Sequence, residues 1–423
     1  MERFLNSIKN NYILEKLSKK YVANYKRKNL ISSLQDRLQK FFLKNEKIEF
    51  PFVNHPDISV ILVLYNQAQF TLECLRLLQK QQNITFEVIV IDNASTDSTP
   101  QLLHYCHNVL VIKNAHNIGF LQAANQGAMV AKGKSLLFLN NDIWHLNSDA
   151  FSIALETLHS GKKIGIVGGK IILPDGLLQE AGVFVTQNGI HQYGRGKKPD
   201  IFEVNFQRHV DYCSGLFLMT PKDLFHGLGG FDLIYSPAYC EDCDYGLRVN
   251  QAGYKVLYNP RIVVGHIEGG SSVKKGYARA LYEKNIILLR NKHKEWLQTT
   301  IHKPAFSRFT SKKVIISRFY QRNCKRILFI GNSISPSQHT LDMMKNACDL
   351  EFAVTYYSLS KFELAWDKIF SLFDIRIEVC KDSGIDALDR FIRSRKNYYS
   401  QILDENGNRE KWSKYSQFLE IYI

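Results

Sequence analysis

The segment after the apolar run SLLFL offers hard oxygen ligands to a cation. It reads Asn140, Asn141 and Asp142. Carboxylate and amide oxygens hold Mg²⁺ or Mn²⁺, and such an ion keeps positions open for phosphate oxygens. We therefore expect Asp142 to be a metal ligand, with helix capping as the alternative. His266, between the apolar VVG and the glycine-rich GGSS, is a second candidate ligand, although an isolated histidine is often structural.

The segment DNASTD follows another apolar run, VIVI. An acidic side chain in this position, here Asp92, can hold a base or a ribose hydroxyl, with Ser95 beside it. The same letters are typical of a turn and a helix cap, a role that we expect of Asp97. The two interpretations are compatible because different residues serve them.

Two further segments carry polar groups suited to an anionic or polar ligand. Tyr65 and Asn66 directly follow the first apolar run, ISVILVL. Asn117, Gly119 and Asn125 lie on a loop and at the start of an expected helix, where backbone N–H groups and amides favour such ligands. All five are candidates for ligand contact.

A cluster of carboxylates opens an expected helix over residues 242–252. Glu241, Asp242 and Asp244 stand close together, and Arg248 follows one turn later. Because like charges repel, at least one of these acids should have a raised pKa or bind a cation or an arginine, and one can act as a general base toward a hydroxyl. Asp242 is the first candidate for this base and Glu241 the second. The alternative is an acid-rich first turn that complements the helix dipole, with Asp244 paired to Arg248, and we expect that pairing.

The elements that position these side chains alternate between strand and helix. ISVILVLYN, FEVIVIDNAS, NVLVIKN and SLLFLNND have strand character, and TLECLRLLQKQ and GFLQAANQGAMVAKG have helical periodicity. This alternation favours a parallel sheet with helices on both faces, and ligands of such sheets bind beyond the carboxyl ends of the strands. After residue 142 the strands are shorter and the turns richer in glycine, so we expect this half to shape the acceptor side.

Two flanking regions complete the domain organisation. Residues 1–55 predict a basic helical extension with apolar positions such as Leu34, Leu38 and Phe41, which could lie on an anionic membrane or pack on the rest of the chain. Residues 56–300 form the expected catalytic domain. From KRILFIGNS onward the pattern restarts, so residues 301–423 predict a short, incomplete Rossmann-like segment.

Composition narrows the class of protein. The 423 residues carry a formal charge of +15, which favours anionic ligands or membrane surfaces, although most basic clusters are expected to be solvated faces. Eight scattered cysteines without a secretory leader predict reduced thiols, and a lone CxxC, Cys240 and Cys243, is a weak metal or redox signal. No run is long enough to span a bilayer, so we expect a cytoplasmic location.

Seven ordered motifs together resemble the catalytic domain of family 2 glycosyltransferases, which have the GT-A fold, a Rossmann-like mixed sheet. They are SVILVLYN, VIVIDNASTD, NIGFLQAANQG, LLFLNND, SGLFLMT with GGFD, YCEDCDYGLR and GHIEGGSS. The resemblance implies that Asp92 and the Tyr65 to Asn66 turn contact the nucleotide, and that Asn141 and Asp142 correspond to the DxD-like metal motif. NND departs from the two or three acids of many members.

The same resemblance implies the remaining roles. Glu241 and Asp242 supply the base, His266 contacts a metal or the diphosphate, and Gly215 and Arg248 lie on the acceptor side. The expected function is inverting transfer from a UDP-, dTDP- or GDP-sugar, with Mg²⁺ or Mn²⁺, to a glycan or lipid-linked glycan. We expect a rhamnosyltransferase-like specificity and a role in bacterial surface polysaccharide or lipopolysaccharide assembly, with peripheral contact to the inner face of the cytoplasmic membrane and no nucleic acid partner.

Two alternatives stay open. A sugar nucleotidyltransferase would share the α/β layout, but LYNQAQF is not the basic glycine-rich loop that it ordinarily needs. A non-catalytic nucleotide-sugar-binding scaffold is the other alternative. The segment from Lys325 is similar to the start of a family 4, GT-B-type glycosyltransferase domain, to which we assign no independent catalysis.

Overall fold

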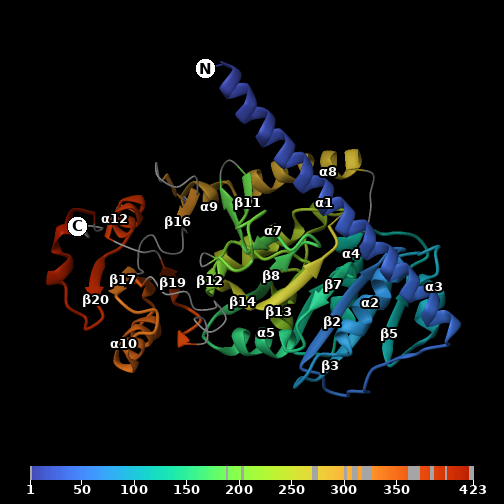
Figure 1. Cartoon of the computed structure of the whole chain (residues 1–423). Coiled ribbons are helices and arrows are strands. Elements are labelled where there is room, and N and C mark those ends of the chain that lie inside the picture. The colour runs from blue at the N-terminus through green and yellow to red at the C-terminus, as the bar shows by residue number, and fades with distance from the viewer. Residues whose placement is uncertain are drawn as a thin grey trace.

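The computed structural model shows an α/β catalytic domain preceded by a long helix and followed by a smaller α/β module (Figure 1). It describes residues 2–186, 189–201, 204–268, 275–299, 303–306, 313–316, 326–360, 372–381, 385–395 and 398–418.

The first half of the catalytic domain has the predicted alternation of strands and helices. Its parallel strands are ordered β5, β3, β2, β6. Parallel strands end at the same edge, so the polar segments after β2, β3 and β6 come together there. The elements are β2 (Ile58–Leu64), α2 (Ala68–Leu78), β3 (Phe86–Asp92), α3 (Thr99–His104), β5 (Val109–Lys113), α4 (Phe120–Val130) and β6 (Ser135–Leu139).

The second half continues the same sheet but mixes strand directions. β13 lies antiparallel between β6 and β8, and β14 is parallel to β8. The expected fold class, an α/β domain with a Rossmann-like mixed sheet, is therefore confirmed. The elements are β7 (Ile143–Leu146), α5 (Ala150–His159), β8 (Ile164–Ile172), β9 (Leu178–Ala181), β10 (Val183–Thr186), β11 (Gly189–Gln192), β12 (Arg208–His209), β13 (Phe217–Pro221), α6 (Lys222–Gly227), a 3-10 turn (Leu233–Tyr235), α7 (Glu241–Gln251), β14 (Lys255–His266), α8 (Lys275–Lys292) and α9 (Lys294–Thr299).

Helices cover both faces of the sheet, as predicted, and alternate residues of β2 show how. Val60 and Leu62 belong to a core that includes Leu75 of α2, whereas Ile61 belongs to a second core that includes Ala124 of α4. Successive side chains of a strand point to opposite faces, so each apolar strand supplies both cores. This double burial holds the strand ends, and the polar loops that follow them, in fixed positions.

The predicted N-terminal helix is α1 (Glu2–Leu43), and its last turns pack on the catalytic domain. Leu34 and Phe41 are buried, and Arg37 forms an ion pair with Glu73 of α2 at 2.9 Å. The short strands β1 (Ile48–Glu49) and β4 (Cys106–His107) pair just after it. The N-terminal end of α1 projects from the body of the molecule (Figure 1). Among the described residues, no helix is both long and apolar enough to cross a bilayer.

A C-terminal module, residues 326–418, has its own parallel sheet and its own cores. The strand order is β19, β18, β17, β20, with helices between the strands. The module lies within residues 301–423, for which an incomplete Rossmann-like segment stays a prediction. Its elements are β17 (Arg326–Gly331), α10 (Gln338–Asp349), β18 (Ala353–Ser358), β19 (Glu378–Lys381), α12 (Ile385–Ser394), β20 (Gln401–Asp404) and a 3-10 helix (Glu410–Phe418), after the strand pair β15 (Lys303–Phe306) and β16 (Lys313–Ile316).

Candidate active site

The loops after β2 and β3 are tied together by Asn66. Its backbone is left-handed, with φ of 60°, and its N–H donates to Ser95 Oγ at 2.8 Å. Asn66 Oδ1 accepts from the N–H groups of Thr96 at 2.7 Å and Asp97 at 3.2 Å. The two loops therefore form one rigid rim, from which Tyr65 projects with 50% of its surface exposed.

Acids of the DNASTD segment stabilise this rim. Asp92 is almost fully buried and accepts from the Ser95 N–H at 3.0 Å. Asp97 accepts from Thr99 at 2.9 Å and from Ala68 at 3.0 Å. Burial alone would raise the pKa of Asp97, but hydrogen bonds from Thr99 and Ala68 hold that pKa below its usual value. Asp97 lies one residue before the N-cap of α3, so the expected cap role is met only in part.

Asn93, which is not among the candidates from sequence, lies at the centre of the next loop. It is buried, its amide donates to Asn117 Oδ1 at 2.9 Å, and its Oδ1 accepts from the Ile118 N–H at 3.1 Å. Gly119 has φ of +86°, and an added Cβ would stand 2.8 Å from the Pro237 side chain. The polar letters of DNASTD were the available signal for Asn93, but nothing in them separates a loop support from a ligand contact.

Asn125 and Arg248 each have partners inside the protein. Asn125 donates to the Phe231 carbonyl at 2.8 Å and accepts from the Phe231 N–H at 2.9 Å. Arg248 pairs with Asp244 at 2.7 Å, as predicted, and donates to the Gly230 carbonyl at 2.6 Å. The structure thus gives both side chains a role in holding the GGFD turn, and their expected contacts to donor and acceptor stay predictions.

Asp142 and His266 face each other at the carboxyl edge of the sheet. His266 Nε2 lies 3.2 Å from Asp142 Oδ1, and both side chains are buried. Asp142 precedes strand β7 and α5 is capped at Asp149, so the alternative that Asp142 caps the next helix is wrong. The adjacent Asn141 donates to Thr71 Oγ1 at 2.9 Å and is thereby turned toward α2.

The hydrogen bonding around His266 leaves two electron-rich atoms facing each other. Its Nδ1 lies 2.7 Å from Gln179 Oε1, which is satisfied when Nδ1 carries the proton and Nε2 keeps its lone pair. Asp142 Oδ1 is buried and has no hydrogen bond among the described residues. Two ligands of one octahedral ion, each about 2.1 Å from it, lie about 3 Å apart. The pair therefore fits a divalent cation whose other ligands come from solvent or substrate.

Two further carboxylates near His266 are held by neighbouring backbone amides. Gly215 N–H donates to Asp242 Oδ2 at 3.0 Å, and Ser214 N–H donates to Glu180 Oε1 at 3.3 Å. Asp242 remains partly exposed, whereas Glu180 is 2% exposed and also accepts from Gln192 at 3.0 Å. Burial, with a contribution from Asp242, raises the pKa of Glu180 to about 7.

Glu180 was missed because its local sequence, LLQEAG, carries no motif. A single acid in a short strand is usually exposed and unremarkable to sequence analysis. Only the pairing of β9 with β8 brings Glu180 beneath Ser214 and near Asp242 and His266. The long-range strand pairing, not the local pattern, identifies it.

The backbone before α7 is held in an uncommon conformation. Tyr239 and Cys240 both have positive φ, 75° and 73°. Asn285 of α8, fully buried, donates to the carbonyls of Tyr235, Ala238 and Tyr239 at 2.8 to 3.0 Å. Strained backbone of this kind costs free energy and persists only where surrounding contacts enforce it. Here those contacts fix the start of α7, and with it the position of Asp242.

Glu241, Asp242 and Asp244 differ sharply in electrostatic environment. Burial, followed by repulsion from Asp242, raises the pKa of Glu241 to about 8, and burial also raises the pKa of Asp242. Burial would raise the pKa of Asp244 too, but His293 at 2.8 Å and Arg248 at 2.7 Å hold it well below its usual range. The predicted raised pKa within the cluster is therefore present, and it belongs to the two acids without a cationic partner.

Neither cysteine of the CxxC segment is bonded to another cysteine. Cys240 and Cys243 are buried free thiols, and burial raises the pKa of both. Across the described ranges, no group of three or more histidine, cysteine or acidic side chains is placed to hold a metal ion. A cation at this cleft would have Asp142 and His266 as its protein ligands.

Part of the sheet and its first loops resemble a known family. Residues 59–184 match the model "Glycosyl transferase family 2". An O-antigen biosynthesis protein, RfbC, of Myxococcus xanthus is 26% identical over 261 residues, which are 59% of this chain and 20% of the relative. An N-acetylglucosaminyl-diphospho-decaprenol L-rhamnosyltransferase of Mycobacterium tuberculosis is 24% identical over 267 residues, 56% of this chain and 86% of the relative.

Other similarities are more distant or partial. An uncharacterized protein, y4gI, of Sinorhizobium fredii is 24% identical over 235 residues, 52% of this chain and 26% of its own length. This chain thus spans about a quarter or less of the length of two of these relatives. A mannosyltransferase of Pyrobaculum calidifontis, solved with GDP-Man and Mn²⁺, is 18% identical, with a TM-score of 0.39, over 61% of this chain and 70% of its own. Residues 59–184 of this chain are therefore similar to glycosyl transferase family 2.

Proposed function

We propose that this chain is an inverting glycosyltransferase that moves a sugar from a nucleoside-diphosphate donor to an acceptor hydroxyl. One observation carries the proposal: Asp242, held by the Gly215 N–H at 3.0 Å, and His266, which faces Asp142 at 3.2 Å, both lie near enough to Glu180 to shift its pKa. A base and an electron-rich cation site at one sheet edge are the groups that such a transfer requires.

Asp242 acts as the base in this proposal. Its carboxylate takes the proton of the acceptor hydroxyl while the hydroxyl oxygen attacks the anomeric carbon, and the bond from that carbon to the diphosphate oxygen breaks with its electron pair on the leaving group. Glu241, with a pKa of about 8, is mostly protonated at neutral pH and is the poorer base. The raised pKa of Asp242 favours proton uptake, and the Gly215 N–H fixes the direction of its carboxylate.

Asp142 and His266 would hold a divalent cation, Mg²⁺ or Mn²⁺, which stabilises negative charge on the departing diphosphate. Gln179 orients the imidazole so that Nε2 faces Asp142. The rim formed by Tyr65, Asn66 and the 92–97 loop would contact the nucleotide. Asn117 and Gly119 border this rim through Asn93.

The acceptor and the cellular role belong to the same proposal. We infer a glycan or lipid-linked glycan acceptor and a place in bacterial surface polysaccharide assembly, supported by the printed names of the two relatives from Myxococcus and Mycobacterium. A cytoplasmic location with peripheral contact to the membrane is consistent with exposed Tyr21 and Tyr25 of α1 beside exposed Lys26 and Lys28.

The test is a donor panel. Full-length protein with Mg²⁺ or Mn²⁺ is incubated with UDP-, dTDP- and GDP-sugars, and released nucleoside diphosphate is measured with and without a glycan acceptor. We expect release from at least one donor, stimulated by acceptor. Donor binding without release from any member would favour the non-catalytic scaffold, and release of pyrophosphate from a nucleoside triphosphate and a sugar phosphate would favour the nucleotidyltransferase.

A further inference from the structure

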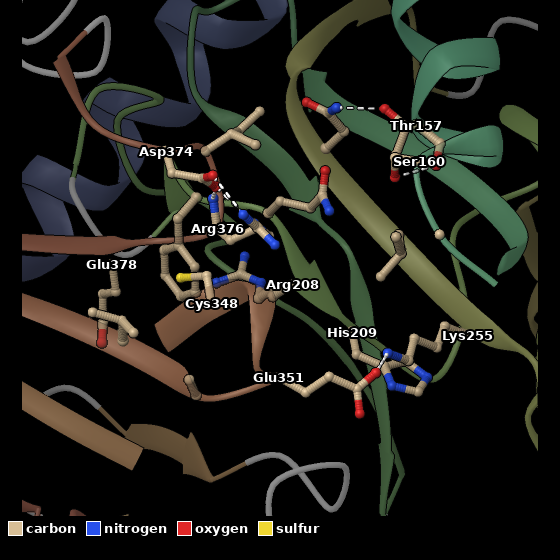
Figure 2. A pocket seen from close by; sticks show the side chains of 18 of the residues that line it. Thr157, Ser160, Arg208, His209, Lys255, Cys348, Glu351, Asp374, Arg376 and Glu378 are labelled. Atoms are coloured by element: carbon tan, nitrogen blue, oxygen red, sulfur yellow. Dashed lines mark hydrogen bonds and ion pairs between the residues drawn. The ribbon is translucent and has the colours of Figure 1, made fainter. Parts of the chain in front are cut away.

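A cavity of about 940 Å³ lies between the catalytic domain and the C-terminal module, away from the cleft just described. The catalytic domain lines it with the end of α5, β12 and the first part of β14, and the module lines it with α10, β18 and residues 374–378. Figure 2 shows side chains from both parts facing this interdomain cavity, among them Arg208 and Arg376. A space built by two domains is a common position for a ligand site.

The two walls are joined by direct contacts. The Gln207 N–H donates to the Ile375 carbonyl at 2.8 Å, and Lys255 pairs with Glu351 at 3.0 Å. Gln207 directly precedes β12, so the module contacts the acceptor-side half of the catalytic domain and not the nucleotide rim. The cavity is therefore positioned to serve the acceptor.

Most acids that line the cavity are paired with a basic side chain. Arg376 pairs with Asp349 at 2.7 Å and with Asp374 at 2.6 Å, and Arg395 pairs with Glu378 at 2.7 Å. A phosphate or nucleotide site needs cations without such partners, because its affinity comes from uncompensated positive charge. Ion-paired side chains still offer hydrogen-bond donors and acceptors to a ligand, but their net electrostatic field is small. Such a lining suits a neutral ligand that carries many hydroxyl groups.

Aromatic rings are the second feature of the cavity lining. The guanidinium of Arg208, 5% exposed, lies 4.1 Å from the Tyr193 ring centroid and 5.2 Å from that of Phe206. Phe184 packs edge-on against Tyr193 at 5.8 Å, and Tyr398 lines the cavity from the module. Aromatic faces beside fixed polar groups bind amphipathic rings, and a pyranose has both C–H faces and hydroxyl edges.

Two hydrogen bonds link the lining of the cavity to the β9 segment that carries Glu180. Gln192 donates to Glu180 on the cleft side, and the next residue, Tyr193, lines the cavity. Arg208 donates from the cavity side to the carbonyl of Ala181, the neighbour of Glu180, at 2.7 Å. The lining of the cavity is therefore bonded directly to the β9 segment that carries Glu180.

We propose that the interdomain cavity binds a neutral oligosaccharide, a part of the glycan acceptor remote from the reacting hydroxyl. The C-terminal module then serves acceptor binding and not a second transfer reaction. This inference rests on the proposed function for the identity of the acceptor. Its test is a binding measurement that needs neither donor nor turnover.

Full-length protein is titrated with linear hexasaccharides of N-acetylglucosamine, rhamnose, mannose and galactose, and binding is followed by saturation-transfer NMR and calorimetry. Phe206→Ala removes a ring and Arg376→Gln removes a charged donor, and we expect each to weaken binding of the preferred hexasaccharide about fivefold. Phe52→Ala, at a ring that is 73% exposed, is the matched control and should bind like the parent.

The outcomes separate this inference from the proposed function. The inference is overturned if no hexasaccharide binds, if both variants bind as tightly as the parent, or if inorganic pyrophosphate displaces the hexasaccharide, which would place it at the diphosphate site. Donor hydrolysis by water, measured separately, should be unchanged in Phe206→Ala and Arg376→Gln. If the parent protein does not hydrolyse any donor, this result counts against the proposed function and not against the oligosaccharide site.

Discussion

The two halves of the catalytic domain use polar side chains in opposite ways. In the first half, which is the donor half in the proposed function, Asn66 and Asn93 are bonded to the loops around them, and these bonds hold the rim in place. In the acceptor half, Glu180, Glu241 and Asp242 gather with no ion pair to lysine or arginine in the described part of the chain. Buried acids without a countercharge cost stability, and they are retained where a reaction needs a base. Buried acids without a charged partner are therefore the clearest structural sign of the candidate site.

Asp242→Asn should show the largest effect on the acceptor half. Removing the base while keeping the shape of the side chain should lower transfer about 100- to 10,000-fold, with donor affinity unchanged. The measurement is single-turnover transfer together with a donor dissociation constant. The exposed Asp223→Asn is the matched control. An Asp242→Asn enzyme with parental turnover would remove Asp242 from the reaction.

Asp244→Asn should affect stability instead of chemistry, although Asp244 lies only two residues from Asp242. Its carboxylate is fully buried and bonded to Arg248, His293 and Lys292. Breaking one partner of a buried ionic network should lower the free energy of unfolding by about 3 to 5 kcal/mol. Urea unfolding at neutral pH measures this loss.

The pH dependence of the same variant sharpens the comparison. The folded state lowers the pKa of Asp244, so its contribution to stability is present above the unfolded pKa and is lost as the pH falls through the folded value. The difference in the free energy of unfolding between the parent and Asp244→Asn should therefore become smaller as the pH falls. A gap that widens as the pH falls would contradict the assignment of Asp244 as a bound anion.

Gln179→Ala tests whether Gln179 orients His266 toward Asp142 at the candidate cation site. Loss of the partner of His266 Nδ1 frees the imidazole to turn from Asp142, and such losses typically weaken metal binding about 10- to 100-fold. Activity against Mn²⁺ concentration, together with direct Mn²⁺ titration, measures the shift. Gln192→Ala is the control, because Gln192 bonds Glu180 and not the histidine. Equal metal dependence in both variants would contradict the role of Gln179.

Most of the donor half could be predicted from sequence because its information is local. Apolar runs such as Ile58–Leu64 predicted strands, and the polar residues after them predicted loops at the shared carboxyl edge of the sheet. The pairing of Asp244 with Arg248 was predictable because one helical turn separates them. Strand direction in the second half, where β13 runs antiparallel, was not determined by any local pattern.

What sequence did not reveal depends on contacts between distant segments. Glu180 reaches the cleft only through the pairing of β9 with β8, and Asn285 supports the Asp242 turn from 43 or more residues away in the chain. The role of Asn93 was hidden because a loop support and a ligand contact use the same residue types. The likeness of the tail to a family 4 domain stays a prediction, since the family match ends at residue 184.

Glu241→Gln gives the most direct test of the electrostatics of the acceptor half. The folded state raises the pKa of Glu241 from 4.5 to about 8 through burial and the nearby Asp242. Between those values the folded chain keeps a proton that the unfolded chain has lost, so the parent loses stability as the pH rises through this window.

The neutral amide of Glu241→Gln cannot titrate, so the variant should gain stability relative to the parent between pH 5 and pH 8, on the order of a few hundredfold in the folding equilibrium constant. Urea midpoints at both pH values measure the gain, with the exposed Glu156→Gln as the control. A parental pH slope in Glu241→Gln would mean that Glu241 is ionised in the folded state. The acceptor half would then hold a charge with an unrecognised partner, and the contrast with the donor half would weaken.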